Sequence, residues 1–182
     1  MPKQSLILKK TMNKITLKPL EGIIINENKI DFGHTKKEII ALLGNPDHEE
    51  DEQLYYDSLD IRFDFDENGL FEFVECQGPY SENSEFTIYK IDPFKLQDND
   101  LLNLLTNENN GEIDTLEAPY SYCFLETSVG IWRASTPTDI ESTISEMKQE
   151  GTYEESKEIM DQDLEKSKHF WTVAVGKISY YK

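Results

Sequence analysis

A strict alternation of apolar and polar residues between positions 59 and 66 is the feature that most limits how this chain can fold. The apolar members are Leu59, Ile61, Phe63 and Phe65, and the polar members are Asp60, Arg62, Asp64 and Asp66. A two-residue period is typical of a β-strand with one buried face. Residues 66–69 then favour a turn, and apolar residues return over 70–74. The sequence therefore predicts a β-hairpin that packs one face against a core.

A short helix is predicted just before this hairpin. Thr35 is a suitable N-cap residue, and Glu38 three positions later completes the pattern of a capping box. Residues 39–43 supply one apolar face, Gly44 suits the position after the helix, and Pro46 blocks its continuation. The order expected here is therefore a helix followed by antiparallel strands.

The second part of the chain repeats short segments of the first part in the same order. Residues 90–92 resemble residues 29–31, residues 100–105 resemble residues 38–43, and residues 127–132 resemble residues 57–62. Agreement in order and spacing indicates a tandem duplication of one helix-plus-hairpin unit. We predict an N-terminal extension over 1–13, a first repeat over 14–84 and a second repeat over 85–182, packed as one globular unit. The predicted fold class is α+β, with antiparallel sheets covered by helices.

The second repeat carries extra elements towards the C-terminus. One helix is predicted over 138–149, with Thr138 as its cap, and another over 153–168. The latter begins with glutamates and ends with lysines, which suits the dipole of a helix. A strand is expected over 171–175, followed by a bulge at Gly176.

The charge of the chain is strongly acidic and unevenly distributed. There are 36 acidic and 18 basic residues, which give a formal charge of −18. The first twenty residues contain five lysines and no acid, so positions 21–182 combine 13 basic with 36 acidic side chains. A protein region with this excess of negative charge repels nucleic acid and anionic membranes but attracts a positively charged protein at long range. The simpler alternative, that the acidity only maintains solubility, stays open.

The cysteine content and the N-terminal region predict a cytoplasmic location. Cys76 and Cys123 are too few for a disulfide framework and are expected to be reduced and buried. The apolar run over 6–8 is too short for the hydrophobic part of a signal peptide. No stretch is long enough to span a membrane as an apolar helix.

The hairpin also matches the pattern of a calcium-binding loop. The matching residues are Asp64, Asp66, Asn68, Gly69 and Glu75. Strand periodicity before the match, and Gly78-Pro79 where an exiting helix would run, favour a plain hairpin turn instead. We therefore predict no metal and no cofactor, and we keep a metal-assisted hydrolase that uses Asp64, Asp66 and Glu75 as an alternative.

An acidic segment next to two tyrosines is the predicted partner-binding site. Its residues are Asp47, Glu49, Glu50, Asp51, Glu52, Tyr55 and Tyr56. Carboxylates steer a basic protein during encounter, and tyrosines anchor it after contact. The segment 47–52 is expected to be a loop, and a purely solvated acidic face is the alternative. No Ser–His–Asp arrangement, nucleophile elbow or phosphate-binding glycine loop occurs, so the chain is predicted not to be an enzyme.

The pattern over 29–75 resembles a layout found in small bacterial proteins. The residues that carry the resemblance are Phe32-Gly33-His34-Thr35, Glu38, Leu42-Leu43-Gly44-Asn45-Pro46-Asp47, Tyr55-Tyr56-Asp57 and the alternating run 59–66. The β-lactamase inhibitor proteins, with tandem helix-plus-sheet repeats, are similar in layout, as are several immunity proteins that neutralise bacterial toxins. By analogy the resemblance implies a toxin inhibitor or immunity protein, and it transfers no site residues. A structural or regulatory interaction module is the remaining alternative.

Overall fold

The computed structural model of the protein describes residues 12–182. The helices are α1 (Lys36–Leu43), α2 (Asp98–Asn109), α3 (Pro137–Glu150) and α4 (Tyr153–Ser167). The strands are β1 (Asn13–Lys18), β2 (Gly22–Ile25), β3 (Asn28–Asp31), β4 (His48–Glu50), β5 (Gln53–Tyr56), β6 (Ile61–Phe65), β7 (Phe71–Gln77), β8 (Ser84–Thr87), β9 (Ile113–Asp114), β10 (Ser121–Phe124), β11 (Val129–Trp132) and β12 (Thr172–Gly176). The predicted extension over 1–13 lies outside the described residues except for Met12 and Asn13, and Asn13 already belongs to β1.

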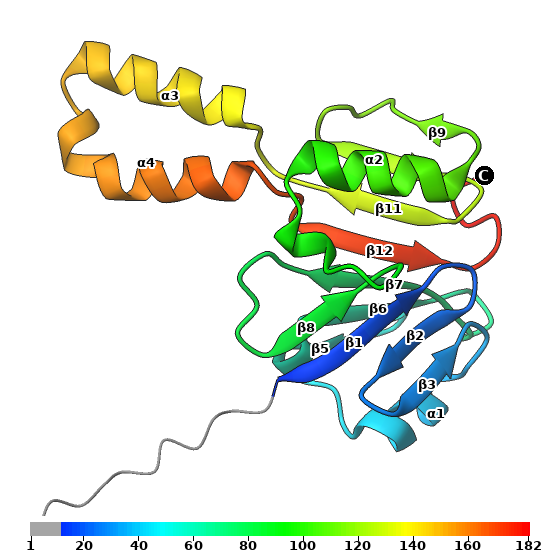
Figure 1. Ribbon diagram of the computed structural model, residues 1–182. Helices are drawn as coiled ribbons and strands as arrows, with labels where there is room; N and C mark the ends of the chain where they lie inside the picture. Colours follow the sequence, from blue (N-terminus) through cyan, green and yellow to red (C-terminus); the bar gives the residue numbers. More distant parts are fainter. Residues whose placement is uncertain (1–11) are drawn as a thin grey trace, which may run out of the picture.

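The strands form two sheets that pack face to face (Figure 1). The larger sheet has eight strands in the order β4-β5-β6-β7-β12-β11-β10-β9, and every neighbouring pair is antiparallel. The smaller sheet has the order β3-β2-β1-β8, in which only β1 and β8 run parallel. Helices and antiparallel-rich sheets confirm the predicted α+β class.

The larger sheet is symmetric about the boundary between β7 and β12. One half is preceded by α1 and contains β4 to β7, and the other is preceded by α2 and contains β9 to β12 in mirrored order. Val74 pairs with Val175 at this boundary, which joins strands about a hundred residues apart in the chain. A tandem duplication would produce this order of elements, and the duplication with its boundaries stays a prediction.

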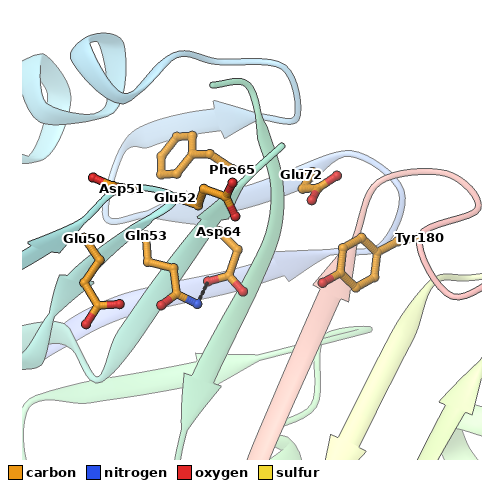
Figure 2. A pocket seen from close by; sticks show the side chains of 8 residues that line it. All are labelled: Glu50, Asp51, Glu52, Gln53, Asp64, Phe65, Glu72 and Tyr180. Atoms are coloured by element: carbon orange, nitrogen blue, oxygen red, sulfur yellow. Dashed lines mark hydrogen bonds between the residues drawn. The ribbon is translucent and has the colours of Figure 1, made fainter. Parts of the chain in front are cut away.

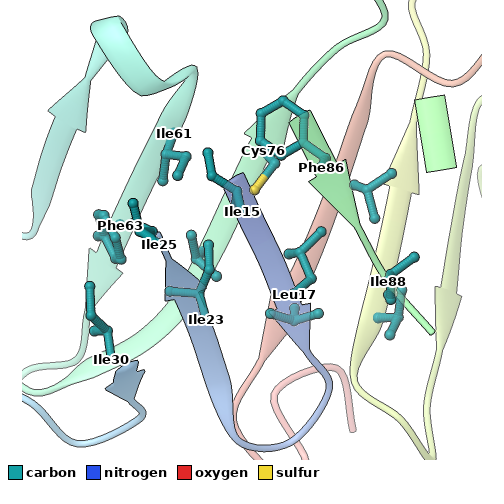
Figure 3. Close-up of a cluster of buried hydrophobic side chains, with 14 of the residues drawn as sticks. Ile15, Leu17, Ile23, Ile25, Ile30, Ile61, Phe63, Cys76, Phe86 and Ile88 are labelled. Atoms are coloured by element: carbon teal, nitrogen blue, oxygen red, sulfur yellow. The ribbon is translucent and has the colours of Figure 1, made fainter. Parts of the chain in front are cut away.

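The hydrophobic core lies between the two sheets (Figure 3). Its buried members include Ile15, Leu17, Ile23, Ile25, Ile30, Ile61, Phe63, Cys76, Phe86 and Ile88. Ile61, Phe63 and Phe65 are buried, as the alternation over 59–66 predicts. Leu59 is only partly buried, because residues 57–59 form a 3-10 turn and β6 begins at Ile61. The other half of the larger sheet is covered by α2, which buries Leu101 and Leu105 (Figure 1).

Local signals at the helix ends are confirmed at α1 and corrected at α3. Thr35 and Glu38 form the predicted capping box, and Gly44 follows α1 with a φ of 86°. At α3 the cap is Thr136 rather than Thr138. Pro137 occupies the first helical position, where its missing N–H costs no hydrogen bond, so the capping residue must precede it.

Two other predictions for strands and loops need correction. Residues 48–50 form β4 rather than part of a loop, because an edge strand can pair its backbone without contributing apolar side chains to the core. Gly176 pairs in register with Phe73 and is not a bulge. The glycine is required because a Cβ there would lie 2.5 Å from the Cβ of Tyr180.

The C-terminal segment 177–182 returns across the outer face of the larger sheet. Tyr180 stacks on Phe73 with ring centroids 4.7 Å apart, and a Cβ on Gly130 would lie 2.1 Å from the hydroxyl of Tyr181. Lys177 forms ion pairs with Asp66 and Glu72. The two tyrosines therefore cover the middle of a face that no helix covers in Figure 1. Within residues 12–182, every helix is too short or too polar to cross a membrane.

Candidate functional site

An open acidic pocket of about 780 Å³ lies on the outer face of the larger sheet, next to its β4 edge (Figure 2). It is lined by Glu50, Asp51, Glu52, Gln53, Asp64, Phe65, Glu72 and Tyr180. Five of these eight residues are acidic, and they come from the β4–β5 turn, from β6 and from β7. Strand pairing therefore assembles the pocket from segments that are separated in the chain. We call it the acidic pocket.

A lysine from α1 fixes the turn that forms one wall of the acidic pocket. Lys36 Nζ donates hydrogen bonds to the carbonyl oxygens of Glu50, at 2.6 Å, and Asp51, at 2.8 Å. It also pairs with the Glu49 carboxylate at 3.3 Å. Because the lysine bonds to these carbonyls, the backbone of the turn is positioned while the side chains of Asp51 and Glu52 remain exposed. Among the described residues, no cation pairs with either of these two carboxylates.

The floor of the acidic pocket is a network around one arginine. Arg62 lies 2.8 Å from the Asp64 carboxylate and 3.2 Å from that of Glu75, and Gln53 donates to Asp64 at 3.2 Å. Burial raises the pKa of Asp64, and its hydrogen bonds from Arg62 oppose this shift. Burial alone would lower the pKa of Arg62, but the bonds and the charge of Asp64 raise it. The network orders the floor and partly neutralises it.

The opposite wall is aromatic and is fixed by the C-terminal segment. The Tyr180 ring stacks on Phe73 with an interplanar angle of 17°. Lys177 lies 2.9 Å from Glu72 and 3.3 Å from Asp66, and its hydrogen bond to Glu72 raises the pKa of the lysine. A carboxylate wall facing a tyrosine ring is suited to a cationic side chain, which can bond to the acids and stack on the ring.

The predicted partner-binding residues are only partly brought together. Glu50, Asp51 and Glu52 line the acidic pocket, and Tyr55 lies beside it and donates to Gln53. Glu49 pairs with Lys36, whereas the Asp47 carboxylate accepts the backbone N–H of Ser58 at 3.3 Å. The carboxylates of Glu49 and Asp47 are exposed but do not line the pocket, and their contacts are with neighbouring elements of the chain.

Tyr56 does not belong to the predicted surface and is corrected here. Its side chain is 2% exposed and packs edge to face against Phe63. Alternation along β5 places Tyr55 on the outer face and Tyr56 on the inner face, so the sequence pattern already contained this distinction. Burial, followed by the charges of Glu49 and Asp47, raises the pKa of Tyr56 to about 12.

Replacing Tyr56 with phenylalanine is expected to affect stability and not partner binding. The hydroxyl donates a 2.9 Å hydrogen bond to the carbonyl of Gly44, the residue that ends α1. Removing the donor should lower the free energy of unfolding by about 1–2 kcal/mol. Urea denaturation followed by circular dichroism measures this loss. An unchanged midpoint would show that the hydrogen bond contributes nothing, and Tyr55→Phe, on the outer face, is the matched control.

The residues of the calcium-loop pattern form a hairpin turn and do not converge. The Asp66 carboxylate accepts the backbone N–H groups of Asn68 and Leu70, each at 3.0 Å, and the bond from Leu70 is the largest cause of its lowered pKa. Glu75 points to Arg62 on the sheet face. Within residues 12–182, no three His, Cys, Asp or Glu side chains are placed to bind a metal ion together. The carboxylates of the hydrolase alternative are thus engaged in turn and sheet contacts.

The thiols of the two cysteines differ in position but not in protonation. Burial raises the pKa of Cys76 in the core and raises that of Cys123, on the outer face, to about 11. Both are therefore protonated near neutral pH, which does not favour nucleophilic attack.

Five residues that line the acidic pocket lie outside the predicted segment 47–52, namely Gln53, Asp64, Phe65, Glu72 and Tyr180. Asp64 was detectable, because the alternation over 59–66 places it on the polar face of its strand. Glu72 and Tyr180 were not detectable, because only the irregular pairing near Phe65 and the returning C-terminal segment bring them there. The assembled pocket brings five carboxylates next to the ring of Tyr180. Comparison of the chain with protein-family models, curated proteins and solved structures finds no match.

Proposed function

We propose that this chain is a non-enzymatic, cytoplasmic binding protein, an immunity protein that neutralises a basic bacterial toxin domain by occluding it. The observation that carries the proposal is the acidic pocket, with carboxylates on one wall and Tyr180 on the other. The carboxylates of Asp51 and Glu52 are exposed and have no cation partner within residues 12–182. They are therefore available to a positively charged protein. The acidic side chains would stand in for the phosphates of a toxin's substrate.

The overall charge supports the same kind of partner. A formal charge of −18 steers a basic domain towards the protein and raises the association rate at low ionic strength. Within the pocket, an arginine could bond in bidentate fashion to a carboxylate while its guanidinium plane stacks on Tyr180. The overall charge would then raise the association rate constant, and the acidic pocket would fix the orientation of the bound partner.

The class of function is tested with the proteins encoded by the genes on either side of this one. Each neighbour is expressed in a bacterial host with and without this chain, and growth and complex formation are measured. We expect one neighbour to be a toxic protein with a basic domain, whose toxicity is relieved by a stoichiometric complex with this chain. The proposal is wrong if no neighbour is toxic, or if toxicity persists although the complex forms.

Reversing the charge of the pocket wall should slow association with that toxin. The triple variant Glu50→Lys, Asp51→Lys and Glu52→Lys is expected to lower the association rate constant by about 10- to 100-fold at low salt. The difference should shrink at higher ionic strength, because salt screens exposed charges. Stopped-flow fluorescence at two salt concentrations measures both effects.

A matched triple variant separates local from overall charge. Glu21→Lys, Glu27→Lys and Glu85→Lys change the net charge equally, and all three residues are exposed on or beside the smaller sheet. We expect this control to slow association by no more than about threefold. Equal slowing by both triples would mean that net charge alone matters, and the acidic pocket would no longer be the contact.

A further inference from the structure

A row of aromatic side chains lies at one end of the larger sheet, where the α3–α4 hairpin leaves it. The row consists of Tyr80, Trp171, Trp132 and Tyr120. Backbone hydrogen bonds connect the segments that carry it: Gly78 donates to Trp171, Trp171 donates to Trp132, and the residue after Trp132 donates to Tyr120. At this end of the sheet, each of the neighbouring strands β7, β12, β11 and β10 therefore has an aromatic residue at or near its terminus. We call this set the aromatic row.

Three side chains of the aromatic row are exposed, and the fourth, Trp171, is partly buried. Trp132 is 44% exposed, Tyr120 38% and Tyr80 58%. Trp132 contacts Trp171 edge to face at 6.2 Å between ring centroids, and the Trp171 indole donates to the Lys166 carbonyl at 3.3 Å. Tyr120 donates to the Asp139 carboxylate at the start of α3. Rigid, exposed tryptophan and tyrosine side chains are the usual anchors of protein interfaces.

The hairpin that starts at the aromatic row is an acidic arm. Helices α3 and α4 pack on each other and project away from both sheets (Figure 1). Residues 137–168 contain ten acidic side chains and four lysines. The acids on the outward face of α4 are Glu154, Glu155, Glu158, Asp161 and Glu165. Ile159 on the same helix is 59% exposed, so the arm also offers an apolar contact.

We propose that the aromatic row and the α3–α4 hairpin together form a docking surface for a positively charged protein, whose arginine or lysine side chains stack on Trp132. The inference rests on the proposed function, because it assigns a second contact to the same kind of partner. Carboxylates on the arm attract cations, and an indole ring is the best aromatic acceptor for a cation–π contact. The chain already uses such contacts internally, with Arg133 4.8 Å from the ring centre of Phe170.

The docking surface and the acidic pocket use different parts of the sheet. The acidic pocket is formed by the β4–β5 turn, β6, β7 and the C-terminal segment, whereas the aromatic row follows the ends of β7, β12, β11 and β10. Tyr180 belongs to the acidic pocket and Tyr181 covers Gly130 of β11, and no residue of the aromatic row lines the pocket. Variants in one place therefore leave the contacts of the other intact, and the two can be tested separately.

The experiment places a photo-crosslinking residue, p-benzoylphenylalanine, at position 132 of the full chain. The probe is the toxin isolated by co-expression with this chain. Leu42 on α1, 39% exposed and remote from the hairpin, is the control position. We expect a covalent complex from position 132 and none from position 42. We also expect Trp132→Ala to weaken affinity by at least about tenfold, whereas Leu42→Ala changes it by less than about twofold.

Because Trp132 also contacts Trp171, a second variant leaves the aromatic row unaltered. Glu154→Lys, Glu158→Lys and Asp161→Lys reverse the outward face of α4 and should weaken affinity by about tenfold at low salt. If crosslinking fails and both variants bind normally while the pocket-wall triple weakens binding, the docking surface is overturned and the proposed function stands. If no neighbouring toxin binds the chain at all, both are overturned.

Discussion

Replacing Phe63 with alanine is expected to lower the free energy of unfolding by about 3–5 kcal/mol, the largest effect of any single substitution considered. Phe63 is completely buried at the centre of β6. Its ring contacts those of Tyr56 and Phe71, with centroids 5.8 and 5.2 Å away. Alanine would remove this contact area and leave a cavity between two sheets whose other side chains cannot all move in to fill it. Equilibrium urea denaturation, monitored by circular dichroism, measures the loss.

The conservative variant Phe63→Leu is the control for this prediction. Leucine fills most of the same space, so the expected loss is about 1 kcal/mol. A loss below about 1.5 kcal/mol for Phe63→Ala would mean that the two sheets close over the vacated space. It would then follow that the packing between the sheets is not a tightly specified core.

Replacing Arg133 with methionine is expected to lower the free energy of unfolding by about 3 kcal/mol and to loosen the root of the α3–α4 hairpin. The arginine is 4% exposed. Its guanidinium donates to the carbonyl of Pro119 at 3.0 Å, to the Asp98 carboxylate at 2.8 Å and to the carbonyl of Ser167 at 3.3 Å. One side chain thus connects the segment before β10, the start of α2 and the end of α4. Methionine has similar volume but no donor, so it leaves these acceptors unpaired.

A double-mutant cycle with Asp98→Asn separates the ion pair from the other contacts of Arg133. We expect a coupling energy of about 1–2 kcal/mol, because the Asp98 side chain is 22% exposed and is only partly desolvated. Hydrogen exchange should rise at both ends of the hairpin in Arg133→Met and remain unchanged in the core strands. Wild-type stability and exchange in that variant would show that the arginine does not fix the hairpin root.

Local sequence patterns predicted most of the individual elements. The capping box at Thr35 and the alternation around Phe63 depend on residues within one helical turn or one strand, so the sequence contains all the information that they need. The cap of α3 was misplaced at Thr138, because Pro137 was not recognised as the first helical residue. Strand β4 was missed because an exposed edge strand needs no apolar residue.

The candidate site was predicted only where it is local. Glu50, Asp51 and Glu52 lie in one turn and were identified as acidic neighbours. The two-residue period of β5 places Tyr56 on the buried face, so the prediction that it belongs to the acidic surface is wrong. Arg133 and its three acceptors illustrate the opposite case, since their positions in the chain carry no signal that they meet.

The sequence by itself determined the α+β class, the first helix, the central hairpin and the acidic character of the chain. Periodicity and capping depend on residues a few positions apart in the chain. The net charge depends only on the composition and not on the order of the residues. Only the tertiary structure decided the pairing of β7 with β12, the return of Tyr180 over Phe73 and the meeting of the aromatic row with the hairpin. Such contacts depend on which distant surfaces are complementary once strands have paired, and that is a property of the packed chain as a whole.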